Sequence, residues 1–199
     1  METESTIREF WFGSQADDSA VASERAALWW SKNPDVDAAI RQRFAALAAR
    51  AASRELDAWN ATPHGTLALI LLTDQFPRNI HRDTPQAFAS DPLARAWCSL
   101  GLGRGDDLQL RPIERVFFYL PLEHSESLDD QERSVALFER LAANVAAEQR
   151  PAFDGFLDYA RRHRDIIARF GRFPHRNRIL GRTTSMAETA FLTEKGSSF

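Results

Sequence analysis

Four ionisable side chains stand where the apolar stripes of three predicted helices should continue. They are Asp74 in helix 63–75, Glu123 and His124 in helix 112–124, and His163 in helix 151–170. In the second helix, for example, the stripe runs from Ile113 to Leu120 and lands next on Glu123 and His124. Because a buried charge without a partner is costly, each of these groups must be paired, hydrated or neutralised. The pattern therefore predicts an internal polar cluster of acids and bases.

Arginines follow two of these helices, each in a Phe-Pro turn. The turns are Phe76-Pro77-Arg78-Asn79 and Phe173-Pro174-His175-Arg176-Asn177, and each is interpreted as a phenylalanine anchor, a proline stop and a polar turn. Asp74 and Glu123 lie in last helical turns, where the helix dipole disfavours a negative charge by about 0.3–1 kcal/mol. We therefore expect Arg78 and Arg176 to join the cluster. The residues leave open whether it is a structural ion-pair lattice or a pocket for a ligand.

Helix start and stop signals divide the chain into the elements that must position these groups. Proline follows a potential N-cap residue at Asn33-Pro34, Thr62-Pro63, Thr84-Pro85 and Asp91-Pro92. Gly103 and Gly171 stand where a left-handed helix terminator is expected. With the apolar spacing, these signals predict helices at 5–12, 19–31, 35–58, 63–75, 85–89, 92–102, 112–124, 128–148, 151–170 and 186–194. The expected fold is an all-α multi-helix array or bundle.

Length and composition fit one globular unit. The chain has 199 residues, of which 44% are hydrophobic and 27% are charged, and no segment has the composition of a linker. We predict a single helical domain over residues 1–199. Within it, residues 184–199 are expected to form a C-terminal helix and a loosely ordered tail.

Several classes of protein are disfavoured by charge and by short motifs. The net charge of −3 argues against general nucleic-acid binding, so no DNA partner is expected. The single cysteine, Cys98, permits no internal disulfide, and the N-terminus lacks the apolar core of a signal peptide. The longest aliphatic run, 67–72, is far shorter than the ~20 residues of a membrane span. We therefore expect a cytoplasmic protein with no membrane partner.

The sequence contains no motif for a metal or a cofactor. HExxH and CxxC are absent, so we predict no metal site and no cofactor. The glycines of 101–105 follow a predicted helix and lack the lysine of a phosphate loop, which indicates a turn.

Long stretches of the chain resemble one protein family. The strings are EFWFG (9–13), TPHGTLALILLTDQFPRNIHRDTPQAFASDPLAR (62–95), FFYLPLEHSESLDDQERSVALF (117–138) and HRDIIARFGRFPHRNRILGR (163–182). Together they resemble the bacterial domain-of-unknown-function family 924. The resemblance implies an all-α fold similar to tetratricopeptide-like helical arrays, and it brings no established reaction, substrate or catalytic residue. It marks nine positions, which we take as the predicted ligand-binding set: Asp74, Gln75, Arg78, Asn79, Glu123, His124, His163, Arg176 and Asn177.

Three functions compete for these residues. The favoured hypothesis is a binding module whose pocket of arginines, carboxylates and histidines takes a small anionic or zwitterionic ligand or a peptide, because guanidinium groups suit oxyanions. The alternative is a hydrolase that uses Glu123 or His124 as general base, with His163 as a further catalytic candidate and arginines that stabilise an anion. The third is RNA binding through the basic segment 161–182, which holds eight arginines and one acid.

Overall fold

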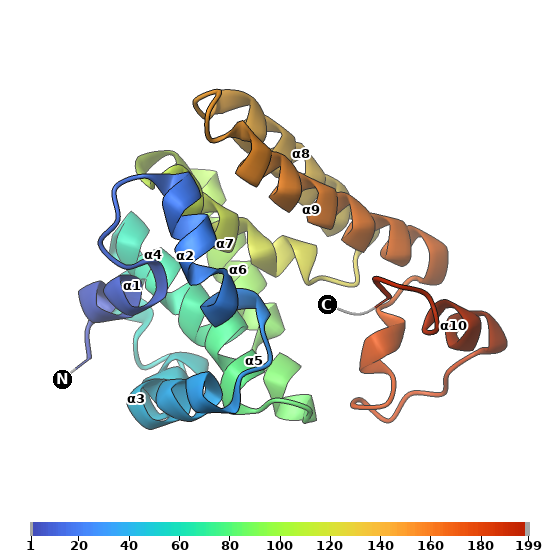
Figure 1. Cartoon of the computed structure of the whole chain (residues 1–199). Helices are drawn as coiled ribbons and strands as arrows, with labels where there is room; N and C mark the ends of the chain where they lie inside the picture. The colour runs from blue at the N-terminus through green and yellow to red at the C-terminus, as the bar shows by residue number, and fades with distance from the viewer. Residues whose placement is uncertain (1, 198–199) are drawn as a thin grey trace.

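Helices account for the secondary structure of the chain (Figure 1). The computed structural model describes residues 2–197, and no strand occurs within that range, so the predicted all-α class is confirmed. The α-helices are α1 (Glu4–Phe12), α2 (Asp18–Trp30), α3 (Pro34–Ala52), α4 (Pro63–Ile70), α5 (Phe76–Ile80), α6 (Asp91–Arg104), α7 (Pro112–Glu123), α8 (Leu128–Asn144), α9 (Arg150–Phe170) and α10 (Met186–Phe191). The shorter turns are η1 (Asp57–Ala61), η2 (Leu71–Gln75), η3 (Pro85–Phe88), η4 (Asp106–Gln109) and η5 (Pro174–Arg176). The loosely ordered tail predicted for residues 184–199 includes residues 198–199, which lie outside the described range.

Side-chain caps start the helices at several of the predicted signals. Asn33 accepts hydrogen bonds from the first turn of α3, and Thr62 accepts one from the backbone of Gly65 in α4. The prediction for Gly103 is wrong. Helix α6 continues through this residue and ends at Gly105, whose left-handed φ of 74° is the conformation that glycine adopts without a Cβ penalty.

The first Phe-Pro turn does not stop its helix, contrary to the prediction. Helix α4 runs through the π-helical turn η2 directly into α5, and the Phe76 N–H donates to the carbonyl of Leu71, five residues back. Pro77 then falls in the first turn of α5, where its missing N–H costs nothing. The widened turn carries Asp74 and Gln75, and π-helical turns are frequent at functional sites.

Both phenylalanine anchors are buried as predicted, in different clusters. Phe76 packs among the aromatic side chains of the main core, with ring centroids 4.8 Å from Phe44 and 5.3 Å from Trp11. Phe173 belongs to a smaller cluster with Ile166, Ile167 and Phe191, which holds η5 and α10 against the end of α9. Figure 1 shows α1 to α7 on one side, with the long α8–α9 hairpin along them and the segment with α10 at the far end of the hairpin. Within residues 2–197, no helix is long and apolar enough to cross a membrane.

Candidate functional site

An aspartate and a histidine from two different helices meet at the centre of the predicted cluster. Asp74 lies in η2 and is fully buried, and its carboxylate oxygens are 2.9 and 3.0 Å from Nδ1 of His124, the residue that ends α7. The Gln75 amide also donates to this carboxylate. Arg78 Nη1 lies 3.5 Å from it and donates to the Asp74 backbone carbonyl.

The charges of this pair follow from its surroundings. Burial opposes ionisation of Asp74, but Arg78, His124 and Gln75 outweigh it and hold the pKa of the carboxyl well below its usual range. Burial and the charge of Arg78 lower the pKa of His124 below its ordinary value of 6.5. At neutral pH, Asp74 is therefore ionised and His124 is neutral, with its proton on Nδ1 and its basic lone pair on Nε2.

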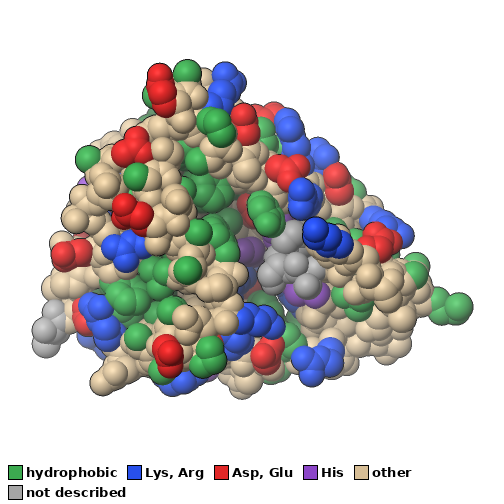
Figure 2. Space-filling view, viewed as in Figure 1, with side chains coloured by type: hydrophobic (Ala, Val, Ile, Leu, Met, Phe, Trp, Pro, Cys, Tyr) green, Lys and Arg blue, Asp and Glu red, His purple; other side chains and the backbone are tan. Residues whose placement is uncertain are grey.

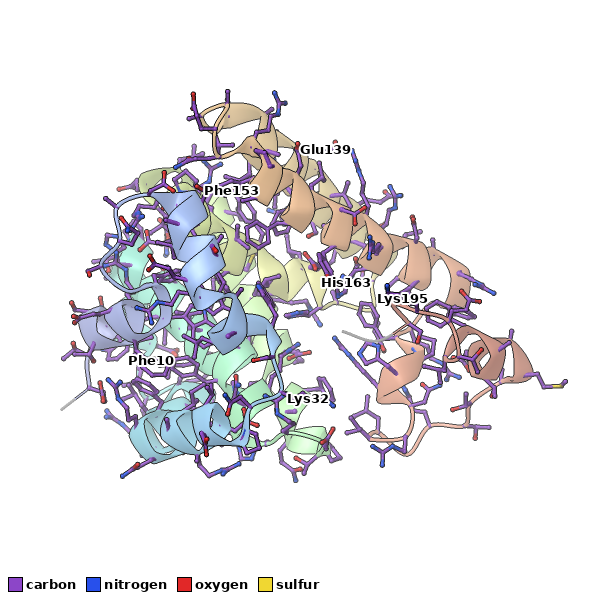
Figure 3. The ribbon with its side chains drawn as sticks, in the orientation of Figure 1. Phe10, Lys32, Glu139, Phe153, His163 and Lys195 are labelled. Carbon is purple, nitrogen blue, oxygen red and sulfur yellow. The ribbon has the colours of Figure 1, made fainter. Side chains whose placement is uncertain are left out.

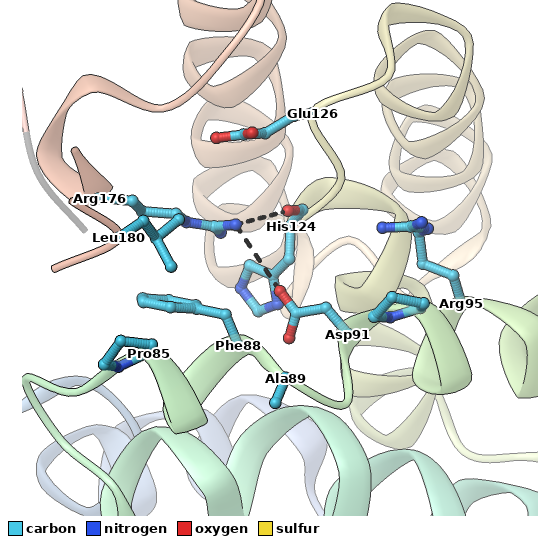
Figure 4. A pocket seen from close by; sticks show the side chains of 10 residues that line it. Pro85, Phe88, Ala89, Asp91, Arg95, His124, Glu126, Arg176 and Leu180 are labelled. Atoms are coloured by element: carbon cyan, nitrogen blue, oxygen red, sulfur yellow. Dashed lines mark hydrogen bonds and ion pairs between the residues drawn. The ribbon is translucent and has the colours of Figure 1, made fainter. Parts of the chain in front are cut away.

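Two arginines and one aspartate surround this pair. Arg78 donates from both Nη atoms to the carboxylate of Asp91, at 3.0 and 3.2 Å. Arg176 Nη1 donates to the backbone carbonyl of His124 at 3.1 Å and lies 3.7 Å from Asp91 (Figure 4). Asp91 thus bridges the arginines of the two Phe-Pro turns.

Arg176 is held between aromatic rings and keeps unused donors. Its guanidinium carbon lies 4.4 Å from the ring centroid of Phe173 and 4.8 Å from that of Phe88. The residue is only 6% exposed, and within the described part of the chain its buried Nε has no hydrogen-bond partner. Burial and the neighbouring Arg78 lower the pKa of Arg176 to about 10, so the group stays charged at neutral pH.

A second acid–histidine pair lies behind the first. His163 on α9 faces the other helices (Figure 3), with Nδ1 at 3.0 Å from Glu123 Oε1 and 2.9 Å from the Tyr159 carbonyl. Its ring centroid is 6.3 Å from that of His124. Burial raises the pKa of Glu123 to about 8, helped by the charge of Asp74, and burial lowers the pKa of His163 to about 3. Both members are therefore neutral at pH 7.

A pocket opens beside the cluster (Figure 4). Its volume is about 290 Å³, and it is lined by Pro85, Phe88, Ala89, Asp91, Pro92, Arg95, His124, Glu126, Arg176 and Leu180. Its two acids already have cationic partners. Asp91 is bound by Arg78, and Glu126 accepts three hydrogen bonds from Arg182, at 2.8–3.0 Å, and one from the backbone N–H of Phe173.

The nine predicted residues divide into three groups. His124 and Arg176 line the pocket, whereas Asp74, Gln75, Arg78, Glu123 and His163 lie behind the wall that these two form. Asn79 and Asn177, the other two members of the predicted set, are directed elsewhere. The Asn79 side chain donates to Asp37 at 2.9 Å, and Oδ1 of Asn177 accepts from Arg182 Nε at 3.0 Å.

Eight pocket residues were absent from the predicted ligand-binding set, and four of these are charged or aromatic: Phe88, Asp91, Arg95 and Glu126. Asp91 has the sequence context of an N-cap, but Ser90 takes that position and leaves the Asp91 carboxylate free to bind Arg78. Glu126 lies in the stretch 121–139, which holds six acids and one arginine and is therefore complementary in charge to the basic segment 161–182; Glu126 pairs with Arg182 of that segment. No sequence pattern pointed to Phe88, because a single phenylalanine in a short turn has no periodicity.

Across residues 2–197, no group of three or more His, Cys, Asp or Glu side chains is arranged as a metal site.

Another hollow, of about 440 Å³, lies between α1, α2 and α3 and contains none of the predicted site residues.

Comparisons with known proteins place this helical chain with its buried acid–histidine cluster in one family. The family described as bacterial proteins of unknown function, DUF924, matches residues 7–196, so the chain belongs to that family. A solved structure of a protein of unknown function from Agrobacterium tumefaciens is similar to it, with 38% sequence identity and a TM-score of 0.75. The similarity covers 89% of this chain and 99% of the other. No curated protein matches the chain.

Proposed function

We propose that the pocket binds a small anionic ligand and that Arg176 is its principal contact. The buried Nε of Arg176 is the observation that carries the proposal. A buried donor without a partner costs about 1–3 kcal/mol, and a charged donor costs more. A ligand oxyanion at this position would remove that cost and match the fork of the guanidinium.

The charge balance of the pocket supports an anion over a cation. Asp91 and Glu126 are already bound by Arg78 and Arg182. Arg95, on the opposite side of the opening from Arg176, lies 3.8 Å from Asp130. Both acids of the pocket are therefore engaged, whereas Nε of Arg176 has no partner among the described residues, and the acids have little capacity left for the ammonium group of a zwitterion.

The size of the pocket favours a small molecule over a peptide. Pockets for drug-sized ligands run from about 300 to 1,000 Å³, and this one, at about 290 Å³, is at the lower limit. Its apolar lining of Phe88, Pro85 and Leu180 suits a compact apolar body attached to the anion.

A thermal-shift panel tests this function. Sulfate, phosphate and benzoate should each raise the Tm of the wild-type protein. A ligand at 100 times its Kd adds about 2.7 kcal/mol to the free energy of unfolding. In Arg176→Lys, which keeps a charge but loses Nε and the fork, the shifts should shrink. Arg178→Ala, at an exposed position of the same segment, is the matched control. Shifts that persist unchanged in Arg176→Lys, or that arise only with cations, would contradict the proposal.

The Asp74–His124 contact favours hydrolysis as a second candidate function. An aspartate that holds the Nδ1 proton of a histidine leaves Nε2 as a general base, and His124 lines the pocket. Glu123, the other candidate base, is behind the wall and stays protonated up to about pH 8 because burial raises its pKa. Esters of small acids are the test substrates, and turnover that is lost in His124→Asn but kept in Glu123→Gln would support this candidate.

RNA binding receives no comparable support. The arginines of 161–182 that form ion pairs with neighbouring acids are Arg161, Arg162, Arg164, Arg172, Arg176 and Arg182. Acidic and basic side chains are interspersed on the face seen in Figure 2. The segment therefore does not present the uniform basic surface that phosphate backbones attract.

A further inference from the structure

His124 is the point where the buried cluster reaches the pocket. Its Nδ1 is committed to Asp74, and its own backbone carbonyl accepts the hydrogen bond from Arg176. The imidazole and the guanidinium therefore form one wall of the pocket (Figure 4). An oxyanion that reaches Arg176 from the opening also approaches the ring of His124.

The charges around this wall cancel when the pocket is empty of ligand. Asp74 and Asp91 carry two negative charges, and Arg78 and Arg176 carry two positive charges, while His124 is neutral. An added anion would leave this group of side chains with an uncompensated negative charge. One proton on Nε2 of His124 restores the balance, because the imidazolium then lies between the Asp74 carboxylate and the ligand.

We propose that the pocket takes up a proton with its ligand: an organic acid binds as its anion to Arg176, and Nε2 of His124 is protonated and donates to it. This inference rests on the proposed anion-binding function and specifies its ligand and its control by pH. The ligand class is a carboxylate or phosphate on a compact apolar body, since Phe88, Pro85 and Leu180 line the remaining wall.

The experiment must distinguish proton uptake by His124 from proton uptake by the other titratable or charged groups near it. They are Asp74 in η2, Arg78 on α5, Asp91 on α6, Glu123 on α7, His163 on α9, His175 and Arg176 in η5, and Glu126 with its partner Arg182. Asp74, Arg78 and Arg176 stay charged from pH 6 to 8, because the pKa of Asp74 is lowered, that of Arg78 is raised and that of Arg176 is about 10. Glu123 is the main competitor, because burial raises its pKa to about 8 and its proton could respond to the ligand in its place.

Isothermal titration calorimetry with benzoate measures the proton directly. Benzoate stays ionised from pH 6 to 8, so any proton taken up belongs to the protein. At pH 7, the binding enthalpy should increase with the ionisation enthalpy of the buffer, with a slope of about 0.5 to 1 proton per benzoate bound. The affinity should fall as pH rises from 6 to 8, by at most about tenfold per pH unit. Benzamide, the neutral isostere, should bind at least tenfold more weakly than benzoate.

Two variants assign the proton to a residue. In His124→Asn, the amide nitrogen can replace Nδ1 as donor to Asp74, so benzoate should still bind, more weakly and with a slope of zero. In Glu123→Gln the slope should be that of the wild type. A slope that survives in His124→Asn and disappears in Glu123→Gln would assign the proton to Glu123 and overturn the inference.

The wild-type protein gives an independent readout that does not depend on a variant's folding. Histidine nitrogen NMR should show Nε2 of His124 changing from unprotonated to protonated when benzoate is added at pH 7. Benzoate binding with no proton uptake would overturn this inference and leave the anion site standing. No binding of benzoate, sulfate or phosphate would overturn the proposed function, and this inference with it.

Discussion

Arg78 and Asp91 are joined by two hydrogen bonds, at 3.0 and 3.2 Å, that tie the end of the α4–η2–α5 helix to the start of α6. The same arginine lies 3.5 Å from the carboxylate of Asp74, which has no exposed surface. One guanidinium therefore pairs with two buried carboxylates, and Arg176, 3.7 Å from Asp91, carries the second positive charge. The pocket wall formed by His124 and Arg176 depends on this arrangement, because Asp74 orients His124 and Asp91 faces Arg176.

Replacing Arg78 with alanine should destabilise the protein strongly. Two buried carboxylates would lose their cation, and removal of one partner of a buried pair costs about 3–5 kcal/mol. Urea unfolding followed by tryptophan fluorescence measures the loss. Arg164→Ala, which breaks only a surface pair with Asp165, should change the free energy of unfolding by less than about 0.5 kcal/mol. A loss of similar size in both variants would show that the cluster is not held by Arg78.

The cluster could be predicted from the sequence because its members violate a periodic pattern. Asp74, Glu123, His124 and His163 occupy places that belong to apolar residues, and that signal is visible without any knowledge of the fold. The pairings could not be predicted. Whether His124 binds Asp74 or another acid depends on how α7 crosses η2, which is a tertiary relationship.

The local backbone was less predictable than the helical class. Capping signals at Asn33 and Thr62 act between neighbouring residues, so they are reliable in isolation. The π-helical turn before Pro77 is different, because it depends on the buried anchor Phe76 and on Arg78, whose side chain donates to the Asp74 carbonyl. The proline alone indicated a stop, whereas tertiary packing carries the helix through it.

Two glycine-to-alanine changes in helices should have opposite effects. At Gly155, in α9, an added Cβ meets no atom within 4 Å, so alanine should stabilise the helix by up to about 1 kcal/mol. At Gly65, in α4, the Cβ would lie 1.9 Å from the backbone carbonyl oxygen of Trp59, which cannot move as a side chain would. Gly65→Ala should therefore lower Tm and Gly155→Ala should raise it. Equal shifts in thermal unfolding would contradict the close approach of η1 and α4.

Acidification should destabilise the protein through its buried histidines. Burial holds the pKa of His163 at about 3 and that of His175 at about 4, against 6.5 as the ordinary value. Below about pH 6.5 the unfolded chain therefore binds more protons than the folded protein. The free energy of unfolding then decreases as pH is lowered, by up to about 1.4 kcal/mol per pH unit for each such group. In His163→Gln, the loss of unfolding free energy between pH 6.5 and 5 should be smaller than in the wild type. An unchanged slope in urea titrations would place the imidazole of His163 in a solvated environment.

Alkaline pH should destabilise the protein through Glu123, and the difference between the wild type and Glu123→Gln from pH 6.5 to 8 isolates this effect. Burial raises the pKa of Glu123 from its ordinary 4.5 to about 8, so the folded protein retains a proton that the unfolded chain has lost. The free energy of unfolding then falls as pH rises through this window, by up to about 1.4 kcal/mol per unit. The histidines whose pKa is lowered by burial act in the opposite direction just above pH 6.5, because the unfolded chain is still losing histidine protons there. Glu123→Gln keeps the shape of the side chain without its titration, so between pH 6.5 and 8 the wild type should lose stability relative to this variant. The exposed Glu132→Gln should retain the wild-type slope, and parallel profiles of the wild type and Glu123→Gln would mean that Glu123 is already ionised and paired with a protonated His163.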